Sequence, residues 1–277
     1  MFRKRPLIII SNDDGYYSKG LSSLSGMLRE VADLLVCAPE APRSGFSCAF
    51  SALADLHLKL RHEEEGMEIW SCDGTPVDCV KMAFNELCGC SDVTRDDCPQ
   101  AKGLSRLADG RKPDMVIGGI NHGNNASVNA QYSGTMGVVL EGCMKFVPSV
   151  AFSLCDHDED ANFEPMADMV KKITLKVLEE GLPKLTCLNV NFPVVEGTYK
   201  GVRTCRMGVG QWSNEVVKCP HPRGFDYYWM VGEYTNIEPD AEDTDDWALT
   251  HGYVAITPTT IDLTAYKAID IVKNWNL

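Results

Sequence analysis

The chain alternates short apolar runs with longer segments whose apolar residues recur at helical spacing. Five runs have the length and composition of strands buried on both faces: Leu7–Ile10, Leu34–Ala38, Asp114–Gly118, Ser149–Leu154 and Cys187–Val190. Four segments have a helical pattern: Gly20–Val31, Pro76–Leu87 with Thr75 as N-cap, Ser133–Phe146 and Phe163–Glu180. Two shorter strands are expected at His57–Leu60 and Met67–Ser71. This alternation predicts an α/β fold with a doubly wound, mostly parallel sheet.

The pattern changes after Phe192-Pro193, where turns, prolines and acidic stretches separate short strands. The elements expected here are Val202–Met207, Asp226–Val231, Tyr253–Thr257 and a helix at Ala265–Trp275. We therefore expect residues 1–193 to form the core, with an insertion at about 88–113. Residues 194–277 are expected to form a smaller β-rich extension with a terminal helix, in which the acidic run Glu238–Asp246 is a solvated loop.

Charge and hydropathy exclude two classes of protein. With 39 acidic and 26 basic residues the net charge is −13, which argues against a protein that coats nucleic acid. A nucleotide substrate stays compatible, because a bound metal reverses the local field. No segment approaches the ~20 apolar residues of a membrane helix. The basic start Met1–Pro6 is followed by too short an apolar run for a signal peptide, so we expect a cytoplasmic protein.

Twelve cysteines are expected to be thiols in such a reducing compartment. Four of them lie within expected core elements, namely Cys37, Cys79, Cys143 and Cys187. Three more, Cys88, Cys90 and Cys98, lie in a polar stretch without a CxxC pair or a fourth ligand. A surface loop with incidental thiols is therefore favoured there over a zinc site.

The first apolar run stops at two adjacent carboxylates and a glycine, Asp13, Asp14 and Gly15. Ligands of open parallel sheets bind beyond the carboxyl ends of the strands, where these residues would lie. Neighbouring carboxylates raise each other's pKa unless a cation or hydrogen-bond donors share their charge, and hard divalent cations prefer oxygen ligands. Asp-Asp-Gly also forms an ordinary turn, so these residues alone leave both interpretations open.

Three further segments place polar side chains after expected strands or at a helix start: Ala38–Gly45, Gly119–Asn125 and Tyr132–Thr135. A helix that opens with Ser-Gly-Thr offers free N–H groups and a favourable dipole to an anion. Together with the two carboxylates, these segments predict a metal site beside an anion-binding site, an arrangement suited to phosphate chemistry. Taken singly, Ser133 is explained as an N-cap, and Asn121 and Asn125 as turn residues.

Several ordered motifs resemble the survival protein E (SurE) family of metal-dependent nucleotidases. They are Ile10–Gly15, Ala38-Pro39 with Arg43–Gly45, Gly74–Val80, Gly119–Asn121, Tyr132–Thr135, Glu141-Gly142, Asn189–Pro193, Gly252–Val254, Thr257-Pro258 and Asp262–Thr264. These motifs extend over nearly the whole chain. Several motifs in the same order are far more specific than any one of them.

The resemblance implies a Rossmann-like domain and a C-terminal part that is exchanged between the subunits of a homodimer or homotetramer. It implies one divalent cation per subunit, Mg²⁺ or Mn²⁺, at the residues matching Asp13, Asp14, Ser44 and Asn121. Phosphate or substrate contact is implied for Asn125, Ser133, Gly134 and Thr135. The implied activity is removal of phosphate from nucleoside 5′- or 3′-monophosphates, sometimes with action on short polyphosphate.

In the expected mechanism, a water activated by the cation attacks in line and gives its proton to Asp13 or Asp14. Asn125 and the N–H groups near Ser133 stabilise the phosphoryl oxygens, so the expected catalytic residues are Asp13, Asp14 and Asn125. His122 either assists protonation of the leaving group or has only a loop role. Ser44 is expected to be a ligand and not a nucleophile, because no Gly-x-Ser-x-Gly sequence surrounds it.

Four other functions compete with this one. An α/β-hydrolase-like esterase is disfavoured by the missing Gly-x-Ser-x-Gly sequence, and a structural module would have little reason to gather so many oxygen ligands at strand ends. Two more are closer to the expected activity. The first is a nucleotide sensor without catalysis, although no glycine-rich P-loop follows the first strand. The second is a phosphatase that acts mainly on polyphosphate or other phosphomonoesters. The chain departs from the family pattern at residues 88–113, which are longer than usual and would alter access to the site. It also departs at Pro258–Thr260, where bulkier residues are common.

Overall fold

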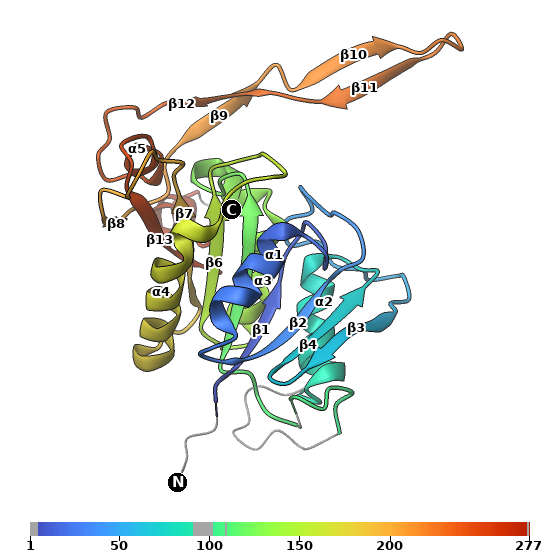
Figure 1. Cartoon of the computed structure of the whole chain (residues 1–277). Coiled ribbons are helices and arrows are strands. Elements are labelled where there is room, and N and C mark those ends of the chain that lie inside the picture. Colours follow the sequence, from blue (N-terminus) through green and yellow to red (C-terminus); the bar gives the residue numbers. More distant parts are fainter. Residues whose placement is uncertain (1–4, 91–101, 109, 276) are drawn as a thin grey trace.

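A nine-stranded sheet in the order β3-β4-β2-β1-β5-β6-β7-β13-β8 forms the centre of the computed structural model, which describes residues 5–90, 102–108, 110–275 and 277 (Figure 1). The strands are β1 Leu7–Ser11, β2 Asp33–Pro39, β3 Leu58–Glu64, β4 Met67–Cys72, β5 Met115–His122, β6 Ser149–Leu154, β7 Thr186–Phe192, β8 Val202–Thr204 and β13 Val254–Thr260. Neighbours from β4 to β7 are parallel, whereas β3 and β13 run antiparallel to β4 and β7. The expected mostly parallel α/β fold is confirmed.

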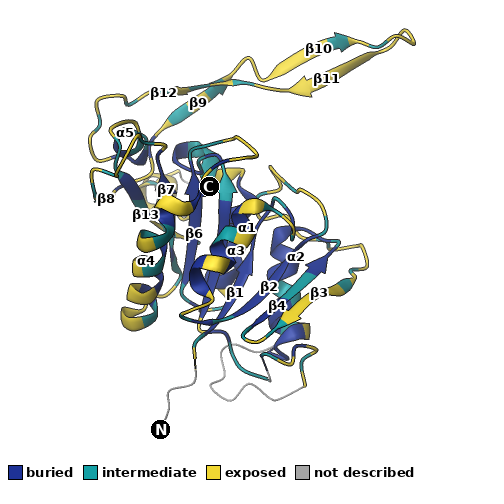
Figure 2. Ribbon diagram, viewed as in Figure 1, coloured by how far each residue is buried: buried dark blue, intermediate teal, exposed yellow. Residues whose placement is uncertain are grey.

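Helices cover both faces of the sheet and complete a three-layer structure (Figure 2). Helices α1 (Lys19–Leu28) and α4 (Ala167–Glu180) contribute to one buried cluster, and α2 (Pro76–Met82) and α3 (Gly134–Met144) to the other. Strand β1 separates the two clusters, because Ile8 and Ile10 pack into the first and Leu7 and Ile9 into the second. Successive side chains of a strand point to opposite faces, which explains why the first four residues of this strand are all apolar.

Local signals placed the start of α2 and the end of α4 correctly, whereas α1 ends at Leu28, three residues before the expected Val31. Thr75 caps α2 in a reciprocal capping box with Asp78, as the sequence predicts for its N-cap. The expected single helix over Pro76–Leu87 continues as a π-helical turn at Ala83–Leu87, and α4 is preceded by a 3₁₀ turn at Glu164–Met166. The strand expected to end at Gly118 extends to His122, so residues 119–122 are not loop. A 3₁₀ turn, η2 (Ser127–Gln131), leads to α3.

The C-terminal third contributes both to the sheet and to a projecting arm. Strands β13 and β8 extend the central sheet beyond β7. The arm, residues 210–236, consists of β9 Gly210–Ser213, β10 Val216–Pro220, β11 Asp226–Met230 and β12 Glu233–Asn236, and it leaves the body as a long ribbon (Figure 1). Two helices follow, α5 (Asp245–Thr250) and α6 (Tyr266–Lys273). The expectation of a solvated loop is wrong for Asp245, which is fully buried at the start of α5.

The expected core cysteines Cys37, Cys79, Cys143 and Cys187 are buried free thiols. Cys88 and Cys90 are also fully buried, so the expected surface loop is wrong there, and Cys98 lies outside the described residues. The expectation of a thiol is also wrong for Cys90, which is disulfide-bonded. Within the described part of the chain, no group of three or more His, Cys, Asp or Glu side chains forms a metal cluster. No helix of that same part has the length and apolar character needed to cross a membrane.

Gly26 offers a test of the local energetics of α1. It is exposed in this helix, and a Cβ added there would have no neighbour within 4 Å. We expect Gly26→Ala to raise the free energy of unfolding by about 0.5–1 kcal/mol, because alanine has the better helix propensity and loses less backbone entropy on folding. Urea unfolding measures this change. Gly224→Ala is the control, since Gly224 also has open space but a φ of +85°, so no gain is expected there.

Candidate active site

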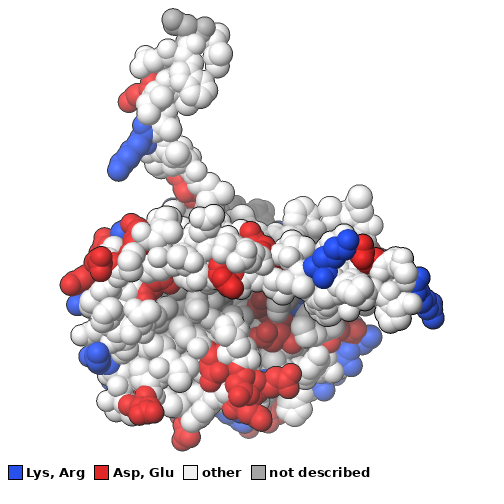
Figure 3. Space-filling view, turned by 90° about the horizontal axis from the view of Figure 1, so that it is seen from above, with Lys and Arg blue, Asp and Glu red and all other residues white. Residues whose placement is uncertain are grey.

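The predicted site residues gather at β1, where the strand order of the parallel sheet reverses. Strand β1 pairs with β2 on one side and with β5 on the other, all parallel, so a crevice is expected beyond the carboxyl ends of β1 and β5. Asp13 and Asp14 come two and three residues after the end of β1, and Asn121 is the penultimate residue of β5. Acidic side chains are prominent on the face of the molecule seen from above (Figure 3). This predominantly negative surface would therefore attract a cation to the crevice.

Asp13 is a buried carboxylate held by its surroundings. The Thr135 hydroxyl donates to Asp13 Oδ1 at 2.5 Å, and the Gly134 backbone N–H also donates to this carboxylate. The Asp13 carbonyl oxygen accepts a hydrogen bond of 2.6 Å from the Arg43 N–H. These contacts bring together β1, the start of α3 and the segment after β2, which are far apart in the sequence.

The two adjacent carboxylates are electrostatically strained when no cation is present. Burial, followed by repulsion from Asp14, raises the pKa of Asp13 to about 6, against the lowering effect of the Thr135 hydrogen bond. Burial also raises the pKa of Asp14, while the His122 imidazole and backbone N–H act in the opposite direction. A cation bound between the two carboxylates would lower the pKa values of both Asp13 and Asp14 again.

One oxygen of Asp14 has no hydrogen-bond partner. Asp14 Oδ2 is among the three buried side-chain oxygen atoms of the described residues that lack one. An unpaired buried carboxylate oxygen is costly, so such an atom points to a missing ligand. His122 lies beside it and has its own orientation fixed, because Nδ1 is 3.0 Å from the Asp158 carbonyl oxygen and the ring packs edge-on against Phe163.

The Asn121 side chain presents its oxygen to the same place. Its Nδ2 donates to the carbonyl oxygens of Gly123 at 2.8 Å and His122 at 3.2 Å, which leaves Oδ1 on the other side, 3.3 Å from the Thr135 hydroxyl. Asp13, Asn121, Gly134 and Thr135 thus form one contact network. Thr135 joins the carboxylate to the amide, a link that its predicted role in substrate contact did not include.

Asn125 lies on a separate network of buried amides. Its Nδ2 donates to Ser153 Oγ at 2.9 Å, its N–H donates to Asn191 Oδ1 at 2.7 Å, and its carbonyl accepts from Asn189 Nδ2 at 2.7 Å. Asn189 and Asn191 were not predicted to support the site. The signal was available, because two asparagines two residues apart in a buried strand point to the same face and need polar partners.

Two predicted residues are not in contact with this network. Ser133 acts as the N-cap of α3 and accepts a hydrogen bond from the Met136 N–H at 3.0 Å. Ser44 is exposed and next to Arg43, whose N–H contacts Asp13, so it reaches the edge of the crevice through the backbone. The phosphate contact of Ser133 and the metal contact of Ser44 therefore stay predictions.

The chemistry of these residues fits a hard divalent cation. Two carboxylates and an amide oxygen converge, one carboxylate oxygen lacks a partner, and the pKa of Asp13 is raised first by burial and then by the charge of Asp14. Mg²⁺ and Mn²⁺ prefer such oxygen ligands. The set contains no sulfur ligand, which argues against a structural zinc site.

The raised pKa of Asp13 predicts a pH-dependent metal affinity. Below pH 6 the metal-free carboxyl group is protonated, so the cation must displace a proton on binding. We expect the apparent Mn²⁺ affinity to fall about tenfold per pH unit below this value and to change little above pH 7. Calorimetric titration in buffers of different ionisation enthalpy would count the released proton. An affinity independent of pH from 5 to 7 would contradict the assignment of Asp13.

Comparison with known proteins agrees with the motifs quoted above. The sequence profile of a family described as "Survival protein SurE" matches residues 8–214. A protein of Bacteroides fragilis named 5′-nucleotidase SurE is 46% identical over 277 residues and covers 100% of both chains. One of the same name from Phocaeicola vulgatus is 48% identical over 100% of this chain and 99% of its own.

A solved structure extends the similarity to the fold. The SurE protein from Aquifex aeolicus has a TM-score of 0.76 and 32% sequence identity, and the match covers 97% of this chain and 98% of that one. The profile and the relatives confirm the resemblance drawn from the motifs, and this structure matches the α/β architecture.

Proposed function

The chain belongs to the survival protein SurE family, and we propose that it is a metal-dependent phosphomonoesterase that hydrolyses nucleoside 5′- or 3′-monophosphates to nucleoside and phosphate. The observation that carries the proposal is the unpartnered Asp14 Oδ2 beside the buried Asp13 carboxylate, at the edge where Asn121 and the start of α3 converge. The relatives named 5′-nucleotidase support the substrate class.

One divalent cation, Mg²⁺ or Mn²⁺, would be held by Asp13, Asp14, Asn121 and Ser44. When bound, it lowers the pKa of a water molecule and withdraws charge from a phosphoryl oxygen. The chain's own residues then have distinct tasks. A free oxygen of Asp13 or Asp14 accepts the proton of the attacking water. Thr135 fixes the Asp13 carboxylate in the required orientation through its 2.5 Å hydrogen bond.

The phosphoryl group would lie between Asn125 and the start of α3. The first N–H groups of a helix have no partner within it, so Gly134 and Thr135 are suited to contact phosphoryl oxygens, while the cap formed by Ser133 fixes this turn. Asn125 presents an amide that is already oriented by Ser153. His122, oriented by the Asp158 carbonyl, is the candidate to protonate the leaving group.

Phosphate release tests this proposal. The panel consists of nucleoside 5′- and 3′-monophosphates, short polyphosphate and a generic phosphomonoester, each assayed with EDTA and then with Mg²⁺ or Mn²⁺ restored. We expect release to stop with EDTA and to return with the metal, at a rate that ranks nucleoside monophosphates first. A higher rate on polyphosphate would favour the alternative phosphatase. Nucleotide binding without release under any metal would favour a non-catalytic sensor.

We also propose that the protein is a homodimer or homotetramer and that residues 194–277 are its oligomerisation element. The arm exposes large apolar side chains, including Val216, Tyr228, Trp229 and Met230, and α6 has no buried residue. An isolated two-stranded ribbon is marginally stable, and exposed apolar patches usually mark an interface. Light scattering at micromolar concentration would contradict this proposal if it gave the mass of a monomer.

A further inference from the structure

Two hydrogen-bond chains join the base of the arm to the loop that carries Asn125. We call residues 208–212 and 234–238 the arm root, and residues 123–133 the site loop. The first chain runs through Ser127 and the second through Asn129, both in the 3₁₀ turn η2. Neither Ser127 nor Asn129 belongs to the site described above, so their bonds require a separate explanation.

Ser127 is fully buried, and three different segments hold it. Its hydroxyl donates to the Gly208 carbonyl oxygen at 3.0 Å, and its N–H donates to Asp245 Oδ2 at 3.0 Å. The phenol oxygen of Tyr234 lies 2.7 Å from Ser127 Oγ and also contacts the Asp246 carboxylate. The backbone of Ser127 has a φ of +53°, a conformation that a serine keeps only where its surroundings enforce it.

The second chain leads directly to the residue before Asn125. Trp212 Nε1–H donates to Asn129 Oδ1 at 2.9 Å. Asn129 Nδ2 then donates to Asn124 Oδ1 at 3.1 Å, and the same oxygen accepts from the Ala126 N–H at 3.3 Å. The indole group of the arm therefore orients Asn129, which in turn orients Asn124.

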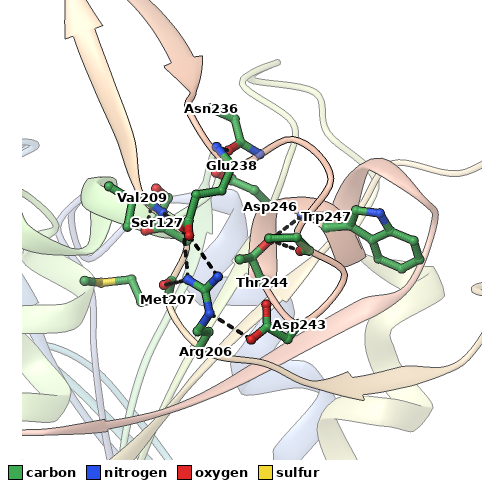
Figure 4. Close-up of polar contacts among 12 residues, drawn as sticks. Ser127, Arg206, Met207, Val209, Asn236, Glu238, Asp243, Thr244, Asp246 and Trp247 are labelled. Carbon is green, nitrogen blue, oxygen red and sulfur yellow. Dashed lines mark hydrogen bonds and ion pairs between the residues drawn. The ribbon is translucent and has the colours of Figure 1, made fainter.

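The arm root itself is fixed to the body of the molecule. Arg206 donates to both carboxylate oxygens of Glu238, at 2.9 and 3.0 Å, and to Asp243 at 2.8 Å (Figure 4). Asp245 also accepts a hydrogen bond of 2.8 Å from the Gly208 N–H. A root held in this way provides a firm support for the site loop.

We propose that Tyr234 and Trp212 are positioning residues for substrate phosphate binding. The sheet fixes Asn125 through Asn189 and Asn191, and the arm root fixes the following turn through Ser127 and Asn129. Both supports are needed to hold Asn125 and the start of α3 in one geometry, since misplacement of a binding group by a fraction of an ångström lowers the rate. This inference rests on the proposed function.

Two conservative substitutions test it. Tyr234→Phe removes only the hydroxyl, and Trp212→Phe removes the indole N–H. We expect each to lower kcat/KM about three- to tenfold, the effect of one lost hydrogen bond, and to raise the inhibition constant of inorganic phosphate to a similar extent. Mn²⁺ affinity should be unchanged, because all four proposed metal ligands, Asp13, Asp14, Ser44 and Asn121, lie outside the site loop. A general loosening of the protein would weaken binding of both the metal and phosphate.

Matched controls outside the arm are Tyr253→Phe and Trp70→Phe, which make the same changes at side chains held away from the site loop, Tyr253 against Trp247 and Trp70 by a hydrogen bond to Glu68. All four variants are compared for thermal stability and oligomeric mass. Equal kcat/KM and phosphate inhibition in the root and control variants would overturn the inference while leaving the proposed function intact.

Hydrogen exchange tests the positioning role of the arm root separately from the proposed phosphatase function, because the measurement requires no activity. In the substrate-free protein, the amides of residues 124–131 should exchange faster in Tyr234→Phe and Trp212→Phe than in the controls. Unchanged exchange there would overturn positioning by the arm root. A wild-type chain without metal-dependent phosphatase activity would overturn the proposed function instead, and the exchange data would still decide whether the arm root orders the loop.

Discussion

Asp13→Asn is expected to lower kcat/KM by at least about 100-fold while leaving the protein folded. Loss of a residue that only orients a metal ligand already costs about 10–100-fold, so loss of a proposed ligand should cost at least the upper end of this range. The change keeps the shape of the side chain and still lets Thr135 donate to it. Steady-state kinetics measure the loss of kcat/KM, and Mn²⁺ titration measures the loss of metal affinity.

The stability of the same variant separates a chemical effect from unfolding. Because the pKa of Asp13 is raised from 3.8 to about 6 in the folded chain, the energetic cost of the buried charge appears as pH rises from 4 through 6. Above pH 7 this cost is about 3 kcal/mol in the metal-free protein, and Asn removes it. We therefore expect the metal-free variant to unfold at the same or a higher temperature than wild type at pH 7.5, with no gain at pH 4.

Asp240→Asn is the control for this experiment, because Asp240 is exposed. It should change neither activity nor metal affinity. The assignment of Asp13 would be wrong if Asp13→Asn kept more than a tenth of wild-type kcat/KM with unchanged Mn²⁺ affinity.

Gly134→Ala is the second substitution with a large expected effect. A Cβ at this position would lie 2.7 Å from Asp13 Cβ and 3.0 Å from both Cγ and Oδ2. Asp13 cannot retreat freely, because Thr135 and the Arg43 N–H hold it from two sides. We expect kcat/KM to fall about 100-fold, the usual effect of displacing a reacting group by about 1 Å, and the free energy of unfolding to fall by about 1–3 kcal/mol.

Gly26→Ala provides the matched control, since it makes the same change in a helix with open space around it. Kinetics and urea unfolding of both variants distinguish a local clash from a general effect of alanine. Wild-type activity in Gly134→Ala would show that Asp13 and the start of α3 do not form one reacting centre.

Most of the core could be predicted because its signals are local. The apolar run before Asp13 is buried on both faces, and a parallel sheet then determines the edge to which Asp13 and Asn121 belong. Thr75 and Ser133 cap their helices as their side chains suggest. In these cases propensity, pattern and tertiary position agree.

The errors occurred where tertiary partners decide the structure. Asp245 lies in an acidic run that looks solvated, yet it is buried because the Ser127 and Gly208 N–H groups supply its hydrogen bonds. Of the four arm strands only β11 was expected, whereas β9, β10 and β12 contain no buried residue and so lack the apolar face by which a core strand is identified. The polar residues Asn121 and His122 suggested a loop, but they continue β5 because β6 pairs with them.

The most direct test of a cation at Asp13 and Asp14 is an anomalous difference map from crystals grown or soaked with Mn²⁺. We expect one strong peak per subunit, with carboxylate oxygens of Asp13 and Asp14 and the amide oxygen of Asn121 as ligands at about 2.0–2.3 Å. A map with no peak at these residues in a preparation that hydrolyses nucleoside monophosphates, or a peak held by other side chains, would contradict this expectation.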